Sequence, residues 1–327
     1  MSRYPDTFIV GAPKSGTTSL YEYLRGHPQV FMPPVKEPCY FARDLARDFA
    51  GSFMVYERDR DIYLSLFEGA ADARRVGEGS TRYLYSRDAP GLIRATVPGA
   101  RIVAMLRNPV DMMYSLHDHK LAGGTEDVAD FGQALALEAE RRAGRRLPPM
   151  SNPLLATYTD RARFGEQIAR WIDTFGRAQV HVMIFEDFVA DPAAEFRRLL
   201  EFLDVDADYQ PPSFAAHNTA HGTRSRRLRA VLHSRPAQWL AWRALPRLIG
   251  ETRTHRLVRA VAQSPLRRRQ GSRQPLAPDL RQRLEAELTP DVERLSGLLG
   301  RDLRELWFER PATAVSSEVE PEAAALS

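Results

Sequence analysis

The chain has 327 residues, 43% of them hydrophobic and 27% charged, and a formal net charge of +4. This length allows one large domain or two small ones with a substantial core, and no apolar run is long enough to cross a bilayer. We recognise no secretory signal peptide. The single cysteine, Cys39, excludes an internal disulfide, and no Cys/His set has zinc-ligand spacing. We therefore expect a cytoplasmic protein without a metal site.

The first predicted unit is a strand at residues 7–10, a Gly-containing turn, and a helix beginning near Thr17. Such βα units bind phosphate groups at the helix N-terminus. The turn, GAPKSGTT, follows the Walker A pattern G-x-x-x-x-G-K-[ST] except that Thr17 replaces the lysine, and Lys14 lies three residues earlier. An ATP site, a site for another phosphorylated ligand and an ordinary turn all stay open at this point.

A second segment, PPVKEPCYF at residues 33–41, follows a short extended stretch at residues 30–32. A Lys–Glu pair in a loop is usually solvated. The prolines and the aromatic pair Tyr40 and Phe41 would instead hold Glu37 in a defined, partly dry place, as a general base requires.

The central part of the chain alternates strands with helices. We expect strands at residues 75–80, 101–106 and 180–185, and helices at residues 89–97, 109–120, 160–175 and 192–203, with a Pro-rich loop at 147–153. This alternation predicts an α/β fold, with a parallel sheet flanked by helices on both faces.

The segment LRNPVDMMYS, residues 106–115, places Arg107 at the carboxyl end of a buried strand. This is the edge at which α/β sheets bind ligands. Arg107 can bind a phosphate with two hydrogen bonds, and Ser115 can supply a hydroxyl from two turns into the following helix. A second phosphate site beside the first loop would indicate a nucleotide phosphorylated at two positions.

The last third is rich in arginine. Residues 224–273 hold fourteen arginines and one acidic residue, with Trp239 and Trp242 among them. Amphipathic helices that pack on the body explain this pattern best. A membrane-facing surface at residues 224–262 is the alternative, and nucleic acid is the weakest candidate because no binding module is recognisable. A helix is expected at residues 279–299 and a disordered tail at 310–327.

These segments in this order resemble the sulfotransferases that use 3′-phosphoadenosine 5′-phosphosulfate (PAPS), most closely the branch with heparan sulfate sulfotransferases and bacterial relatives. The resemblance covers most of residues 7–205 and 275–307, including RWIDTF, VHVMIFEDF and FLDV. It implies a P-loop-type fold with a helical C-terminal portion, as one domain over residues 1–309. PAPS would be the co-substrate, and the resemblance implies no metal ion.

The resemblance also assigns residues. Glu37 would be the catalytic base, and Lys14 would stabilise the leaving phosphate. The 5′-phosphosulfate would bind the loop, and the 3′-phosphate would bind Arg107 and Ser115; the loop residues are Lys14, Ser15, Gly16, Thr17, Thr18 and Ser19. Arg269 and Gly271, in RRRQGSR, are candidates for a late nucleotide-contacting loop.

The chain also departs from the family pattern. Heparan-type members carry a second lysine ahead of a Ser-Pro-x-Tyr segment, whereas this chain has GEGSTRYLY with Gly79 at that place. Arg82 or Lys36 could replace the missing charge. Two alternatives stay open: a P-loop nucleotide kinase or NTPase, and a non-catalytic nucleotide- or lipid-binding protein on the same fold. The acceptor is expected to be a carbohydrate, a glycolipid or a small molecule and not a nucleic acid, with peripheral contact at the inner membrane face as an option.

Overall fold

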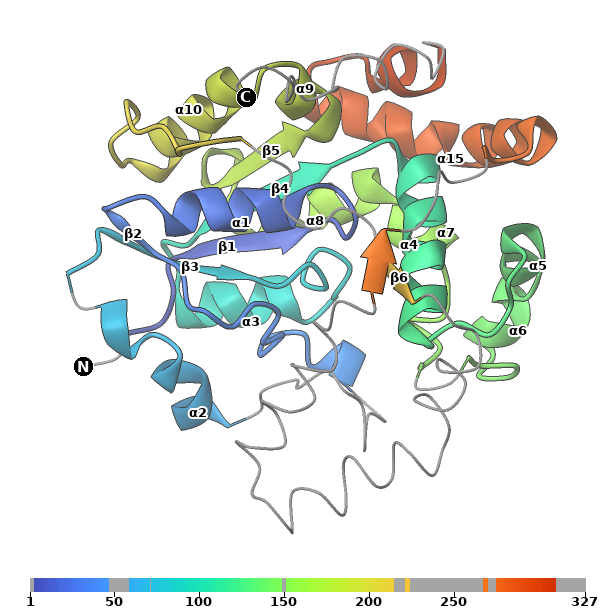
Figure 1. The fold of residues 1–327 in the computed structure, drawn as a ribbon, viewed down its shortest axis with the longest axis horizontal. Coiled ribbons are helices and arrows are strands. Elements are labelled where there is room, and N and C mark those ends of the chain that lie inside the picture. Colours follow the sequence, from blue (N-terminus) through green and yellow to red (C-terminus); the bar gives the residue numbers. More distant parts are fainter. Residues whose placement is uncertain are drawn as a thin grey trace, which may run out of the picture.

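A five-stranded sheet forms the centre of the protein (Figure 1). The structure is a computed structural model that describes residues 3–46, 59–70, 72–148, 151–214, 221–223, 267–269 and 275–309. The strand order is β2-β3-β1-β4-β5, and every neighbouring pair is parallel. The strands are β1 (Thr7–Gly11), β2 (Val30–Phe31), β3 (Arg75–Gly79), β4 (Arg101–Leu106) and β5 (Val180–Ile184). The predicted parallel α/β fold is confirmed.

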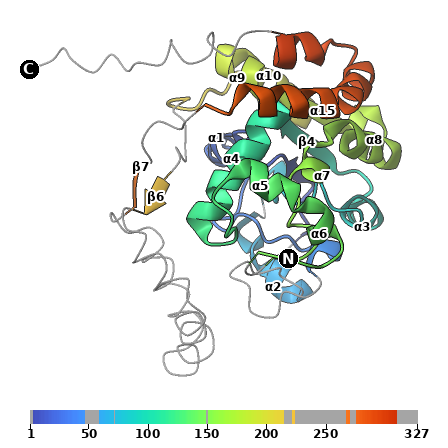
Figure 2. The same cartoon turned by 90° about the vertical axis from the view of Figure 1, so that its right-hand side faces the viewer.

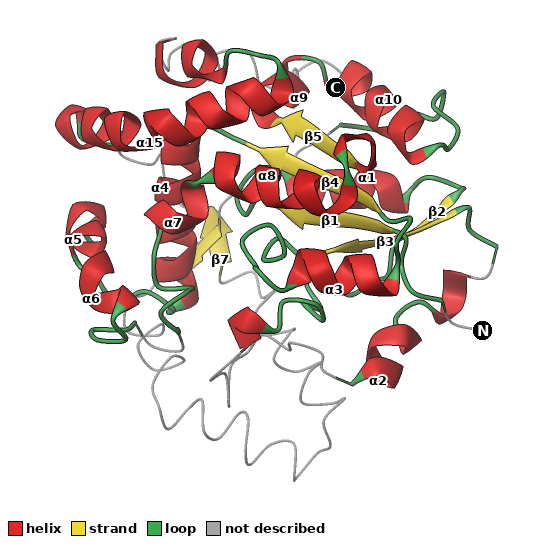
Figure 3. Cartoon of the chain, turned by 180° about the vertical axis from the view of Figure 1, so that it is seen from behind, coloured by secondary structure: helices red, strands yellow, loops and turns green. Residues whose placement is uncertain are grey.

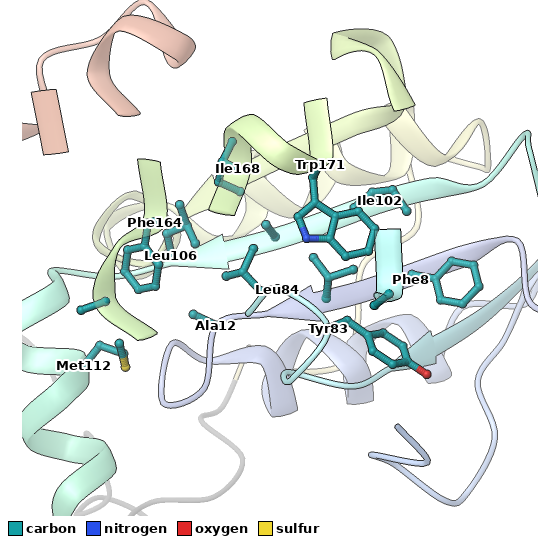
Figure 4. Packing of buried hydrophobic residues seen from close by; sticks show 14 of the residues in the cluster. Phe8, Ala12, Tyr83, Leu84, Ile102, Leu106, Met112, Phe164, Ile168 and Trp171 are labelled. Atoms are coloured by element: carbon teal, nitrogen blue, oxygen red, sulfur yellow. The ribbon is translucent and has the colours of Figure 1, made fainter. Parts of the chain in front are cut away.

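Helices cover both faces of the sheet, because alternate strand residues point to opposite sides (Figure 3). On one face, Ile9 and Val103 pack in a core with α1 (Thr17–Arg25) and α10 (Pro192–Leu203). On the other, Phe8 and Ile102 pack with α3 (Ala89–Thr96) and α8 (Phe164–Phe175). Figure 4 shows Trp171 and Ile168 of α8 in this second core. Both face layers are fully buried, as the continuous apolar strands require.

Helix α4 (Pro109–Gly123) begins directly after strand β4. The side chain of Asn108 accepts hydrogen bonds from the N–H groups of Val110 (3.0 Å) and Asp111 (3.3 Å), and so caps the helix start. Pro109 occupies the first turn, where its missing N–H has no cost. This strand–helix junction puts Arg107 at the predicted edge of the sheet.

Several elements differ from the sequence-based expectation. The predicted helix at residues 160–175 is divided into α7 (Thr159–Ala162) and α8, and Phe185 begins a helix, α9 (Phe185–Ala190), instead of ending a strand. The connections contain short helices that the sequence did not indicate, because one or two turns show too little periodicity to be recognised. They are α2 (Arg60–Ser65), α5 (Phe131–Ala136), α6 (Glu138–Arg142) and the 3₁₀ turns Asp44–Ala46, Glu68–Ala70 and Arg177–Gln179.

The C-terminal helix α15 (Pro278–Leu299) packs against α8 and α4. The Asp291 carboxylate accepts hydrogen bonds from Gly165 N (2.7 Å) and Glu166 N (2.9 Å), and so caps the start of α8. A π-helical turn at Glu305–Glu309 follows and buries Trp307. The predicted helical C-terminal portion therefore belongs to the same packed body as the sheet.

Two short strands lie apart from the main sheet (Figure 2). β6 (His221–Thr223) pairs antiparallel with β7 (Arg267–Arg269), and β6 contacts α4. The Arg-rich segment predicted as helical, residues 224–273, lies outside the described residues except for β7, which is a strand. Gly271, the membrane-facing surface at 224–262 and the predicted tail at 310–327 also lie outside them. Among the described helices, none has the length and apolar character of a membrane span.

Candidate active site

The predicted phosphate loop connects β1 to α1. Its start is tied to the neighbouring strand, because Ala12 N donates to the Met105 carbonyl at 2.7 Å. Gly11 is required for space, since a Cβ there would lie 2.6 Å from the Cβ of Leu84. Gly16 has a φ of 83°, which favours glycine, and it immediately precedes the first residue of α1. The two glycines of the Walker-like pattern thus have separate structural reasons.

The N-terminus of α1 is available for an anion. No side chain caps it, and Ser15 and Thr17 are buried beneath the turn. The N–H groups of the first helical turn and the helix dipole favour a negatively charged ligand there. Lys14 adopts a left-handed backbone conformation, with a φ of 61°, within the same turn. Left-handed non-glycine residues concentrate at functional loops.

Lys36 reaches this loop from the second segment. Its Nζ donates to the hydroxyl oxygens of Thr18 (3.0 Å) and Thr17 (3.4 Å). Burial lowers the pKa of Lys36, while the nearby carboxylates of Glu37 and Glu22 oppose that shift. Since both hydroxyls are uncharged, the ammonium brings a positive charge to the start of α1. This places one of the two candidates for the missing charge at the phosphate loop.

The space around Gly79 explains why a side chain is missing there. A Cβ on Gly79 would lie 2.8 Å from the ring of Tyr21 and 3.4 Å from Cε of Lys36. Tyr21 is 1% exposed, and its hydroxyl donates to the Pro33 carbonyl, so its ring cannot move aside freely. The other candidate, Arg82, has its Nη1 3.9 Å from the sulfur of Cys39. Lys36 therefore occupies the region that a lysine at residue 79 would enter.

Glu37 is held by Thr81. The N–H of Thr81 donates to Oε2 of Glu37 and its hydroxyl donates to Oε1, both at 3.0 Å. Glu37 N donates to the Gly79 carbonyl at 2.9 Å, and its φ of 65° is left-handed. The carboxylate keeps further lone pairs for a proton. Thr81 was missed by the sequence analysis; it stands where the family segment has proline, which has no N–H to donate.

Arg107 lies over the ring of Phe185, with its Cζ 5.0 Å from the ring centroid. The same ring is the nearest neighbour of Gly16, where a Cβ would lie 3.0 Å from it. Phe185, the first residue of α9, thus lies next to both the phosphate loop and Arg107. The sequence offered no sign of this, since Phe185 was read as the end of a strand. Ser115 is half-buried in α4, two turns after Pro109.

Glu186, which follows Phe185, has a structural role. Its Oε1 accepts from Asn108 N, and its Oε2 accepts from Nε1 of Trp307, both at 3.0 Å. Asn108 Nδ2 also donates to the Trp307 carbonyl at 2.5 Å. The residue after Arg107 is therefore anchored to the C-terminal portion of the chain.

The remaining sequence-predicted residues are less well placed. Ser19 is 8% exposed on α1 and faces the core side of the helix. Arg269 lies in β7, whose partner strand β6 contacts α4, the helix that carries Ser115. Gly271 is outside the described residues. Over the ranges that the structure describes, no group of His, Cys, Asp and Glu could hold a metal ion.

Comparisons with known proteins agree with this geometry. The sequence model of the sulfotransferase family matches residues 5–209. The crystal structure of a sulfotransferase from Alicyclobacillus acidocaldarius is 30% identical, with a TM-score of 0.69, and the match covers 94% of this chain and 100% of that one. Strand order, phosphate loop and C-terminal helix therefore belong to a fold that a solved sulfotransferase shares.

Two human proteins are also similar. Heparan sulfate glucosamine 3-O-sulfotransferase 6 is 28% identical over 209 residues, which are 62% of this chain and 53% of that protein. Bifunctional heparan sulfate N-deacetylase/N-sulfotransferase 3 is 26% identical over 214 residues, which are 63% of this chain and 23% of that protein. The chain thus matches about half of the first relative and a quarter of the second. From the family match and the shared fold, the chain belongs to the family of PAPS-dependent sulfotransferases.

Proposed function

We propose that this protein transfers the sulfuryl group of PAPS to a hydroxyl or amine of a carbohydrate, glycolipid or small-molecule acceptor. The observation that carries the proposal is the contact between two loops. Lys36 reaches Thr17 and Thr18 of the phosphate loop, while its neighbour Glu37 is fixed by Thr81. A candidate base is thereby joined to the place where the phosphosulfate would bind.

The two phosphates of the nucleotide have separate binding groups in this proposal. The 5′-phosphosulfate binds the N–H groups from Ser15 to Ser19 at the uncapped start of α1, with Lys14 and Lys36 beside it. The 3′-phosphate binds Arg107, whose planar guanidinium suits a phosphate, and the Ser115 hydroxyl. The ring of Phe185 packs against the guanidinium of Arg107 and holds it in place.

In the proposed reaction, Glu37 removes a proton from the acceptor as the acceptor oxygen or nitrogen attacks sulfur in line. The new bond to sulfur forms while the bond from sulfur to the bridging oxygen breaks, and that oxygen leaves on 3′-phosphoadenosine 5′-phosphate (PAP). Lys14 and Lys36 stabilise the charge that develops on the leaving phosphate. A fixed donor of this kind contributes roughly 3–4 kcal/mol in enzymes where one was removed.

Carbohydrate acceptors have the most support. The names of the two human relatives specify heparan sulfate as what those proteins act on. Since this chain spans only part of each, the acceptor class comes to it by proposal. Cytoplasmic localisation is likewise proposed from the single reduced cysteine, Cys39, which is buried.

The test supplies labelled PAPS and a mixed acceptor extract and follows PAP release and labelled products. We expect transfer by the wild type and its loss in Glu37→Gln and Arg107→Ala. Binding of PAP without turnover on any acceptor would instead favour a non-catalytic nucleotide-binding protein. Magnesium-dependent ATP hydrolysis that disappears in Thr18→Ala would contradict the proposal in favour of an NTPase.

A further inference from the structure

A second carboxylate, Glu78, lies buried behind the loop that carries Lys36 and Glu37. It belongs to β3 and is 1% exposed. It accepts three hydroxyl donors: Tyr63 at 2.6 Å and Tyr83 at 3.0 Å bond to its Oε2, and Ser80 bonds to its Oε1 at 2.6 Å. The reaction proposed above uses neither Glu78 nor these hydroxyls.

Two of the three hydroxyls also bind the loop. The Ser80 hydroxyl oxygen accepts the N–H of Cys39 at 3.0 Å, and the Tyr83 hydroxyl oxygen accepts the N–H of Phe41 at 3.2 Å. Tyr63, on helix α2, differs. Its hydroxyl donates to Glu78, and among the described residues it bonds no amide of the loop. The loop is thus attached to Ser80 and Tyr83 through the amides of Cys39 and Phe41, two and four residues after Glu37.

The direction of these hydrogen bonds depends on the charge of Glu78. An ionised carboxylate only accepts, so the Ser80 and Tyr83 protons must point toward it. Their oxygen lone pairs then face the loop and can accept from Cys39 and Phe41. We propose that Glu78 is a positioning residue, whose ionised carboxylate orients the Ser80 and Tyr83 hydroxyls so that they hold the loop bearing Lys36 and Glu37. The effect on catalysis rests on the proposed function, whereas the attachment of the loop does not.

Protonation would weaken this arrangement. A protonated carboxyl group becomes a donor, and one of its three hydroxyl partners would have to turn away or accept. Burial raises the pKa of Glu78 to about 7, and the negative charge of Glu37 adds to the effect, while the three hydroxyl donors oppose it. The other titratable groups that face Glu78 are phenols and a thiol: Tyr21 of α1, Tyr63 of α2, Tyr83 and Cys39. Burial raises the pKa of each of these, so they stay neutral near pH 7 and Glu78 is the member of the cluster that changes charge.

The inference predicts hydrogen exchange at individual amides. In Glu78→Gln, an NH2 group replaces one of the two carboxylate oxygens and would donate to the hydroxyl on that side, Ser80 or Tyr83, which must then accept. Protection of at least one of the Cys39 and Phe41 amides should therefore fall about tenfold, the value of one lost hydrogen bond. Ser80→Ala should expose Cys39 alone, and Tyr83→Phe should expose Phe41 alone. Tyr63→Phe, measured well above pH 7 where Glu78 is ionised, is the matched control: it removes a Glu78 partner of the same chemistry without touching either amide, and should change both by less than about threefold.

The exchange measurement uses the full-length protein without ligand, so its outcome does not depend on turnover. Wild-type protection factors at these two amides should also decrease as the pH falls through about 7, and Glu78→Gln should show no such step. Unchanged protection in Glu78→Gln would overturn the inference. If that variant does not fold, Ser80→Ala and Tyr83→Phe decide instead. Wild-type protection of the Cys39 amide in the first and of the Phe41 amide in the second would overturn the inference.

Activity tests the catalytic consequence separately. With PAPS and the acceptor extract, Glu78→Gln should lower kcat about tenfold or more. It should weaken the binding of PAP by less than removal of the Lys36 charge does, because Lys36 and Arg107 both keep their charges. Loss of amide protection with normal kcat would show that the loop attachment does not position the base. Absence of any wild-type turnover would instead contradict the proposed function and leave the exchange result standing.

Discussion

Thr81 fixes the candidate base with two hydrogen bonds from one residue. Its N–H and its hydroxyl each bond a different oxygen of Glu37, which sets the plane of the carboxylate. Family knowledge indicated Glu37, but nothing in the sequence indicated Thr81, because hydrogen bonds between residues 44 positions apart leave no local pattern. The sequence indicated candidate residues for the loop and the base, whereas the partner that orients Glu37 is visible only in the structure.

Removing the Thr81 hydroxyl tests this arrangement. Thr81→Val keeps the size and the backbone N–H but leaves Oε1 of Glu37 without its donor. Without this donor the plane of the carboxylate is no longer fixed, so kcat/KM at neutral pH should fall about fivefold to tenfold, the value of one hydrogen bond. Thr81→Ser should restore the wild-type kcat/KM; an unchanged kcat/KM in Thr81→Val would contradict the role.

Lys36 makes a second prediction at this scale. Lys36→Met keeps the length of the side chain and removes the charge at Thr17 and Thr18. A charge-assisted contact contributes about 1.5–3 kcal/mol, so PAP binding measured by calorimetry should weaken at least about tenfold. Arg25→Met, at the exposed end of α1, is the control and should bind as the wild type does. Equal affinities for Lys36→Met and wild type would remove Lys36 from the site.

Among the elements, the long strands and helices were predictable because their apolar patterns are sustained. The sequence predicted β4 (Arg101–Leu106) and α10 (Pro192–Leu203) with their observed ends. It merged α7 with α8, because the break at Arg163 contains neither glycine nor proline. It extended β5 into Phe185, since an aromatic residue suits a strand and a helix start equally. That single-residue difference concealed the contact of Phe185 with Arg107.

The packing of α15 on α8 can be tested at Gly165. A Cβ on Gly165 would lie 2.3 Å from the backbone oxygen of Asp291, so Gly165→Ala forces the two helices apart. Overpacking of this kind costs about 1–3 kcal/mol, and denaturant unfolding should show a loss of that size.

Gly297→Ala is the control for that substitution. Residue 297 lies in α15 with no atom near the added Cβ, and replacing glycine within a helix should stabilise the protein by about 0.5–1 kcal/mol. A Gly165→Ala protein as stable as the wild type would mean that α15 is not held against α8 as described.

Considered as a whole, the molecule joins its N-terminal phosphate loop, the central Arg107 and the C-terminal Trp307 at one edge of the sheet. The order of motifs predicted the fold and the family. It did not predict how the loops meet, since that depends on packing between distant segments. The Lys36 contact with the phosphate loop is an example, because the sequence only offered Lys36 and Arg82 as equal candidates.

Whole-molecule stability should depend on His181. Burial, together with the charges of Arg177 and Arg198, lowers the pKa of His181 to about 4. The unfolded chain, with an ordinary histidine pKa near 6.5, therefore takes up a proton that the folded chain excludes. Stability from this group is complete above about pH 6.5 and is lost as the pH falls toward 4, by up to about 3 kcal/mol. His181→Asn should remove this part of the pH dependence in urea unfolding, and an unchanged slope would contradict it.

The central claim is that Arg107 and the phosphate loop, with Lys14 in it and Lys36 beside it, together bind a nucleotide with phosphates at both the 3′ and 5′ positions. Calorimetric titration with PAP, AMP and ADP, once with EDTA and once with magnesium, tests it most directly. We predict that PAP binds at least about a hundredfold more tightly than AMP, as one bidentate charge-assisted phosphate contact allows, and that Arg107→Ala abolishes this preference while leaving AMP binding unchanged. Equal affinity for PAP and AMP, or a preference for ADP that requires magnesium, would contradict the account.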